Sequence, residues 1–145
     1  MLNLELIEER LDQIRVSVNR LKKMKSMSLE EFLLDPDYFA ISEHHLRRSL
    51  EALFDIGRHI IAKNGFGKPE NYKQILDILG QQRIITPEFS KKIGGMAGYR
   101  NRLVHGYAKV SPEEIYNIIQ TKLDDFVQFC IFIVKFIDSQ AKCKK

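Results

Sequence analysis

The sequence has few of the residues that build metal centres, disulfide frameworks and phosphate-binding loops. Its 145 residues include two cysteines, Cys130 and Cys143, whose spacing matches no zinc-binding pattern. Two cysteines are also too few for a dense disulfide framework. A glycine-rich phosphate loop, a pair of catalytic carboxylates and a constellation of metal ligands are all missing from the sequence. We therefore predict a protein that uses no metal and no cofactor.

Long apolar segments are missing as well. The most apolar window covers residues 126–137, contains Gln128 and Lys135, and is shorter than the roughly 20 residues that span a bilayer. The first residues do not combine a positively charged region with an apolar core, as a signal peptide would. We expect a cytoplasmic protein that makes no membrane contact.

The composition is that of one globular domain covering residues 1–145. Hydrophobic residues make up 44% of the chain, enough for a sizeable core. Lysine and arginine outnumber aspartate and glutamate by 23 to 19, a formal net charge of +4. This mild excess permits an acidic partner such as RNA but does not require one. Residues 140–145 are rich in lysine, and we expect them to form a frayed tail.

The apolar spacing throughout the chain is that of helices, and no segment alternates as a strand would. Capping boxes begin at Ser28 and Ser111, Pro36 suits a first helical turn, and Gly65 is a typical helix stop. These signals predict an all-α, up-down bundle with four main helices and short accessory helices. The expected helices cover residues 3–26, 28–34, 36–64, 71–80, 87–105 and 112–139.

Two features of the expected helices favour a homodimer. Gly94, Gly95 and Gly98 fall inside the predicted 87–105 helix, where each costs about 1 kcal/mol relative to alanine. Close approach of another backbone is the expected compensation, and a kink at Gly94–Gly95 is the alternative. The 126–137 segment is apolar on nearly all faces, which favours burial against a second chain.

A polar stripe runs along the predicted 36–64 helix and consists of Arg47, Glu51, Asp55 and Arg58. The interpretation that we favour is a solvated face with ion pairs along the helix, each contributing a few tenths of a kcal/mol. The alternative is that the stripe borders an active site.

The densest concentration of chemistry is residues 99–107, Tyr-Arg-Asn-Arg-Leu-Val-His-Gly-Tyr. The fork of Arg100 suits phosphate oxygens, and His105 can exchange a proton near neutral pH. These two side chains converge only near a helix end or where the backbone departs from ideal helical geometry. Gly106 predicts that the helix ends here, with Leu103 and Val104 facing inward. The alternative is an ordinary helix C-terminus whose basic residues complement the helix dipole. Residue spacing alone favours neither interpretation.

The order of Arg100, Asn101, His105 and Tyr107 resembles the Arg-x4-His-x-Tyr motif of the HepT toxins, which belong to the HEPN superfamily of small all-helical proteins. The resemblance extends over most of the chain, including residues 47–61, residues 72–79 and the Val-Ser-Pro-Glu-Glu-Ile-Tyr segment that begins at Val110. It implies the toxin of a type VII toxin–antitoxin system, a metal-independent ribonuclease that acts as a homodimer.

The resemblance also implies a role for each motif residue. Arg100 and His105 would be catalytic, and Asn101 would orient His105 or the phosphate. Tyr107 would accept an adenylyl group from a nucleotidyltransferase antitoxin, which would neutralise the toxin. The alternative function is a non-catalytic subunit that binds a nucleotide or a nucleotidyltransferase partner through the same residues.

Overall fold

The computed structural model describes residues 1–104 and 110–143, and every residue placed in regular structure in these ranges is helical. The all-α prediction is therefore confirmed. In this part of the chain the helices are α1 (Leu4–Lys22), α2 (Leu29–Leu34), α3 (Pro36–Asn64), α4 (Tyr72–Gln81), α5 (Pro87–Lys92), α6 (Met96–Val104), α7 (Pro112–Thr121) and α8 (Leu123–Cys143).

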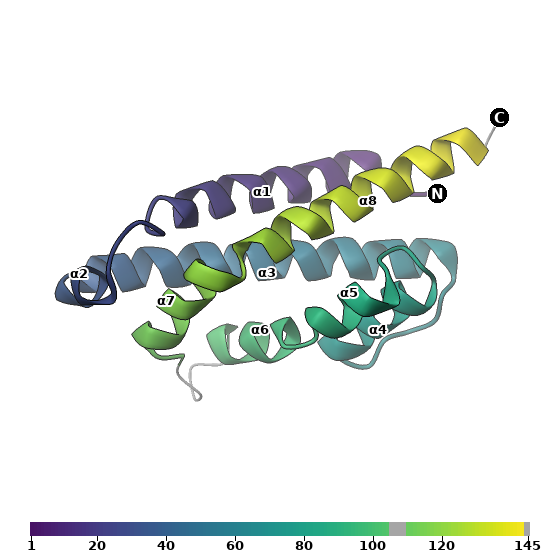
Figure 1. Cartoon of the computed structure of the whole chain (residues 1–145). Helices are drawn as coiled ribbons and strands as arrows, with labels where there is room; N and C mark the ends of the chain where they lie inside the picture. Colours follow the sequence, from purple (N-terminus) through teal and green to yellow (C-terminus); the bar gives the residue numbers. More distant parts are fainter. Residues whose placement is uncertain (105–109, 144–145) are drawn as a thin grey trace.

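The long helix α3 is the centre of the bundle (Figure 1). In this view α1 lies above α3, whereas α4, α5 and α6 lie below it, and α8 crosses the bundle diagonally. The fully buried aromatic rings come from α2, α3 and α8: Phe32, Phe54, Phe126 and Phe129. Of the described helices, none is both long enough and apolar enough to cross a membrane.

The predicted helix starts and stops are confirmed where a local capping signal exists. Ser28 and Ser111 each form a complete capping box with the glutamate three residues later. The Asp35 side chain accepts a hydrogen bond at the start of α3, and Pro36 follows it in the first turn. Gly65 ends α3 in the left-handed conformation, at φ +66°, which a residue without a Cβ adopts at no steric cost.

Two of the predicted long helices are each divided in two. The 87–105 helix is broken at residues 93–95, so that α5 and α6 are separate helices joined by a turn at Gly94–Gly95. Two consecutive glycines stabilise a helix poorly, which explains the break. A Cβ added at Gly95 or Gly98 would meet nothing within 4 Å. The expected close approach of another backbone is therefore wrong for those two positions within the described chain.

The final predicted helix is broken at Lys122, between α7 and α8. No glycine or proline marks this position, but the Thr121 hydroxyl donates a hydrogen bond to the Asn117 carbonyl four residues earlier, a contact that bends helices. At its other end α8 continues to Cys143, beyond the expected end near residue 139. No helix-breaking residue intervenes there.

Most of the apolar surface of α8 is covered by this chain itself. Phe126, Phe129, Cys130 and Ile133 are buried, because α8 packs against α1, α3 and α7. A stripe of Val127, Ile131 and Val134 stays about two-fifths exposed and lines a groove of about 500 Å³ with residues of α1. The expectation that α8 is too apolar for a single chain therefore applies only to this stripe.

Candidate active site

Helix α6 holds Arg100 against the opening residue of α4. Met96, Ala97 and Leu103 are the buried residues of α6, and the helix packs on α3 and α4. Arg100 is half-buried, and its Cζ atom lies 4.2 Å from the centre of the Tyr72 ring. At this distance the positive charge is attracted by the face of the ring. The guanidinium is thus held at a defined place although its side chain is long.

Tyr72 is itself fixed by its surroundings. It is the first residue of α4, and the Asn71 side chain caps that helix by accepting a hydrogen bond from the Gln74 N–H. The buried Phe54 ring of α3 meets Tyr72 edge-on, with ring centres 5.0 Å apart. A second guanidinium, that of Arg58, lies 5.3 Å from the centre of the same ring. One tyrosine therefore holds two arginines from different helices.

These residues surround a small polar pocket of about 230 Å³, which is lined by Glu51, Phe54, Asp55, Arg58, Tyr72 and Arg100. The Asp55 carboxylate is paired across the bundle with Arg10 of α1, with Nε and Oδ2 3.1 Å apart. Neither Arg58 nor Arg100 forms an ion pair with a carboxylate in the described part of the chain. Both guanidiniums therefore keep N–H donors that can bind an anionic ligand.

The pocket corrects our interpretation of the polar stripe on α3. We favoured a solvated face with ion pairs along the helix, but the described residues contain no ion pair between members of the stripe. Glu51, Asp55 and Arg58 instead border the pocket of Arg100. Asp55 and Arg58 are exposed, so the solvated part of the interpretation is confirmed for these two residues. The ion-pair part is wrong because the spacing of charges along one helix does not reveal which other helices pack beside it.

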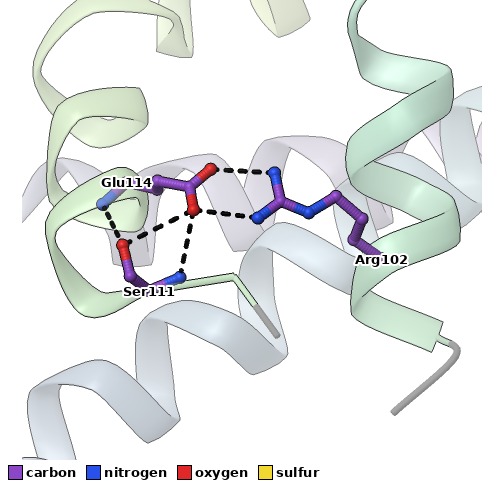
Figure 2. A network of polar contacts seen from close by, with 3 residues as sticks. All are labelled: Arg102, Ser111 and Glu114. Carbon is purple, nitrogen blue, oxygen red and sulfur yellow. Dashed lines mark hydrogen bonds and ion pairs between the residues drawn. The ribbon is translucent and has the colours of Figure 1, made fainter. Parts of the chain in front are cut away.

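Arg102 is not among the residues that line this pocket, and its side chain joins α6 to α7 (Figure 2). Its two terminal nitrogens donate to the two carboxylate oxygens of Glu114, at 2.8 and 2.9 Å. One of those oxygens also accepts from the backbone N–H of Ser111, so the pair is part of the capping box of α7. The hydrogen bonds from Arg102, followed by the Ser111 N–H, hold the pKa of Glu114 below its ordinary value.

For the remaining motif residues, the structure confirms one prediction, contradicts another and leaves others outside the described residues. Asn101 is exposed, and its side chain donates no hydrogen bond to, and accepts none from, another described residue. Leu103 is buried as expected, but Val104 is 38% exposed, so its predicted inward position is wrong. The predicted roles of His105 and Tyr107 concern residues outside the described ranges. Among the described side chains, no group of three histidines, cysteines or acidic residues is placed to hold a metal ion.

Two residues of the site were not predicted from the sequence. No sequence pattern around Tyr72 indicates a role in the site, because that role depends on the guanidiniums of Arg58 and Arg100, which other helices place over its ring. Glu114 was predicted only as part of a capping box, and its bidentate pairing with Arg102 depends on how α6 and α7 meet.

A family model described as ribonuclease HepT-like matches residues 6–133. The chain belongs to the HepT-like ribonuclease family. This membership confirms the resemblance stated from the motif, and it extends that resemblance from α1 to the middle of α8.

Three relatives illustrate the family. A protein named tRNA nuclease HepT, from Aphanizomenon flos-aquae, is 35% identical over 129 residues, and the alignment covers 87% of this chain and 87% of that relative. A protein named mRNA nuclease HepT, from Shewanella oneidensis, is 33% identical over 85 residues, which cover 59% of this chain and 64% of that relative. A solved structure of a tri-AMPylated Shewanella oneidensis HEPN toxin, in complex with an MNT antitoxin, has a TM-score of 0.81 and 26% identity. It covers 93% of this chain and 99% of the toxin.

Proposed function

We propose that this HepT-like protein is a ribonuclease toxin that cleaves RNA without a metal ion and is neutralised by a nucleotidyltransferase partner. Family membership supports a nuclease, as do the two relatives named as nucleases of tRNA and mRNA. The observation that carries the proposal is the half-buried guanidinium of Arg100, which has no carboxylate partner among the described residues and borders a polar pocket. Such a group is suited to bind a phosphodiester.

In the proposed reaction, the 2'-oxygen of a ribose attacks the adjacent phosphorus and the bond to the 5'-oxygen breaks. One His105 accepts the proton of the 2'-hydroxyl as general base, and a second His105 donates a proton to the leaving 5'-oxygen as general acid. The Arg100 guanidinium stabilises the charge on the phosphorane oxygens, and Asn101 orients His105 or the phosphate. The products are a 2',3'-cyclic phosphate and a 5'-hydroxyl.

This mechanism calls for a homodimer, because one chain supplies a single copy of His105. A two-fold axis beside the mouth of each site would bring two copies of His105 and Arg100 into one cleft. The groove between α1 and α8 is not that cleft, since Arg100 lies with α4 and α6 on the other side of α3 (Figure 1). We therefore assign the shared cleft to the α6 side, where Gly98 leaves open space.

Neutralisation is proposed to occur at Tyr107. The tyrosine oxygen attacks the α-phosphorus of ATP and loses its proton. The bond between the α-phosphorus and the oxygen that bridges to the β-phosphate breaks, so pyrophosphate leaves and AMP is joined to the tyrosine oxygen. The HEPN toxin in the similar solved structure is AMPylated and bound to its antitoxin, which supports this class of modification. An adenylyl group two residues from His105 would place its phosphate where Arg100 can bind it and would exclude RNA.

The test of catalysis is RNA cleavage by the purified protein in the presence of EDTA. We expect cleavage by the wild type, and a loss of about 100-fold to 10,000-fold in Arg100→Ala and in His105→Ala, with unchanged helical circular dichroism. Arg48→Ala, an exposed position elsewhere on α3, is the control and should retain activity. If the wild type cleaves no RNA but binds nucleotide or partner, and Arg100→Ala and His105→Ala weaken that binding, the alternative function as a non-catalytic binding subunit holds instead.

The test of neutralisation uses Tyr107→Phe, which keeps the ring and removes the acceptor oxygen. After co-expression with the cognate nucleotidyltransferase, intact-mass measurement should find AMP on the wild type and none at this position in the variant. The variant should fold, dimerise and escape neutralisation. An adduct mapped only to other residues would refute the assignment of Tyr107.

A further inference from the structure

The pocket of Arg100 contains a second unpaired cation whose function the catalytic scheme does not include. The guanidinium of Arg58 lies on α3, yet it is held 5.3 Å from the centre of the same Tyr72 ring that holds Arg100 at 4.2 Å. Both arginines line the one pocket of about 230 Å³. Two helices that are distant in sequence thus place two forks of hydrogen-bond donors side by side.

The charges around the two arginines leave them available to an anion. Two carboxylates line the pocket, and that of Asp55 is already paired with Arg10, at 3.1 Å. The carboxylate of Glu51 has no ion-pair partner among the described residues and lies in the same pocket, so it offsets one of the two positive charges. A guanidinium that lies over an aromatic ring keeps its N–H edge free for a phosphate.

We propose that Arg58 is a second RNA-binding residue, which contacts a phosphate next to the scissile phosphate bound by Arg100. The proposal rests on the proposed ribonuclease function. Arg58 binds the strand equally in the ground state and the transition state, whereas Arg100 contacts the phosphorus that reacts. Tyr72 is a positioning residue for both arginines, because its ring faces the two guanidiniums and is itself fixed by Phe54.

The experiment is a kinetic and salt-dependence analysis of Arg58→Gln on a short single-stranded RNA. We expect KM to rise about tenfold with kcat nearly unchanged, as for the loss of one charge-assisted contact. The slope of log(kcat/KM) against log[salt] should become shallower by about 0.7, the value for one phosphate contact on a single strand. Arg58→Lys keeps the charge and should restore most of the salt slope.

The matched control is Arg48→Gln, which removes the same charge from an exposed position of α3 outside the pocket. It should leave KM and the salt slope unchanged. Tyr72→Leu should raise KM and lower kcat together, because both arginines lose the ring over which they lie. Equal salt slopes for wild type and Arg58→Gln would refute the proposal, as would equal effects of Arg58→Gln and Arg48→Gln.

A binding measurement separates this inference from the ribonuclease function itself. RNA affinity is measured by fluorescence anisotropy in the His105→Ala background, in which no cleavage is expected. A weaker affinity on adding Arg58→Gln supports the RNA contact whether or not the wild type cleaves RNA. If the wild type cleaves RNA and the added substitution leaves the affinity unchanged, the inference about Arg58 is wrong and the ribonuclease function stands.

Discussion

Helix α4, which begins with Tyr72, packs closely on α3 at Gly57, and this contact can be tested by adding one carbon atom. A Cβ at Gly57 would lie 2.7 Å from Cγ2 of Ile75 and 3.2 Å from Cδ1 of Leu79. Both of these α4 residues are fully buried. The Cγ2 atom of isoleucine is attached to Cβ and cannot move away by rotation of a distant bond. Gly57→Ala must therefore displace α4 or its side chains.

The expected magnitude is a balance of two terms. Replacing a mid-helix glycine by alanine stabilises the helix by about 1 kcal/mol. Overpacking a close-packed core costs about 1–3 kcal/mol. We expect the overpacking cost to exceed the gain in helix propensity, because both neighbouring side chains are buried. Gly57→Ala should therefore lower the free energy of unfolding by about 1 kcal/mol.

The assay is urea unfolding followed by circular dichroism at 222 nm, at one protein concentration, because association shifts apparent stability. The midpoint should fall while the m-value stays constant. Gly98→Ala in α6 is the matched control, since its new Cβ would meet nothing within 4 Å, and it should raise stability by up to about 1 kcal/mol. A stabilising effect of Gly57→Ala equal to that of Gly98→Ala would refute the packing argument.

Three further predictions concern titrating groups. Burial, followed by the charges of Lys63 and the N-terminus, lowers the pKa of His59. The stability contributed by the neutral ring is therefore complete above about pH 6.5 and is lost as the pH falls through the folded pKa. His59→Gln should flatten the decline of unfolding free energy below about pH 6.5. Burial raises the pKa of Cys130 to about 11, so in Cys143→Ser protein a thiol reagent at pH 8 should label Cys130 only on unfolding. Glu114→Gln should lower Tm at neutral pH, because the hydrogen bonds from Arg102 that depress the carboxyl pKa are weakened.

Each of these predictions has an outcome that would contradict it. Identical pH dependence in wild type and His59→Gln would mean that other groups account for the decline. Labelling of native Cys130 as fast as that of the unfolded chain would mean that the thiol is accessible. For Glu114, the difference in Tm should vanish as the pH falls through its depressed pKa. Glu113→Gln, an exposed neighbour, is the control and should change Tm little.

Much of the fold was predictable from the sequence because helix ends are determined by contacts within a few residues. The boxes at Ser28 and Ser111, the cap at Asp35 and the stop at Gly65 involve only local atoms. The break at Lys122 was missed, whereas at Gly94–Gly95 the predicted alternative was a kink and the structure has a full break. At Gly94–Gly95 the same residues fit a kink as well as a break, and at Lys122 the sequence contains no helix breaker.

The sequence by itself determined the family, the helical class and the choice of Arg100 as a candidate, because each depends on residue type and order along the chain. Only the tertiary structure decided what surrounds that arginine. Spacing along α3 could not reveal that Arg58 lies over a ring supplied by α4, or that Asp55 pairs with Arg10 of α1. Those contacts join residues from different helices, so they depend on how the helices pack and not on the period of any one of them.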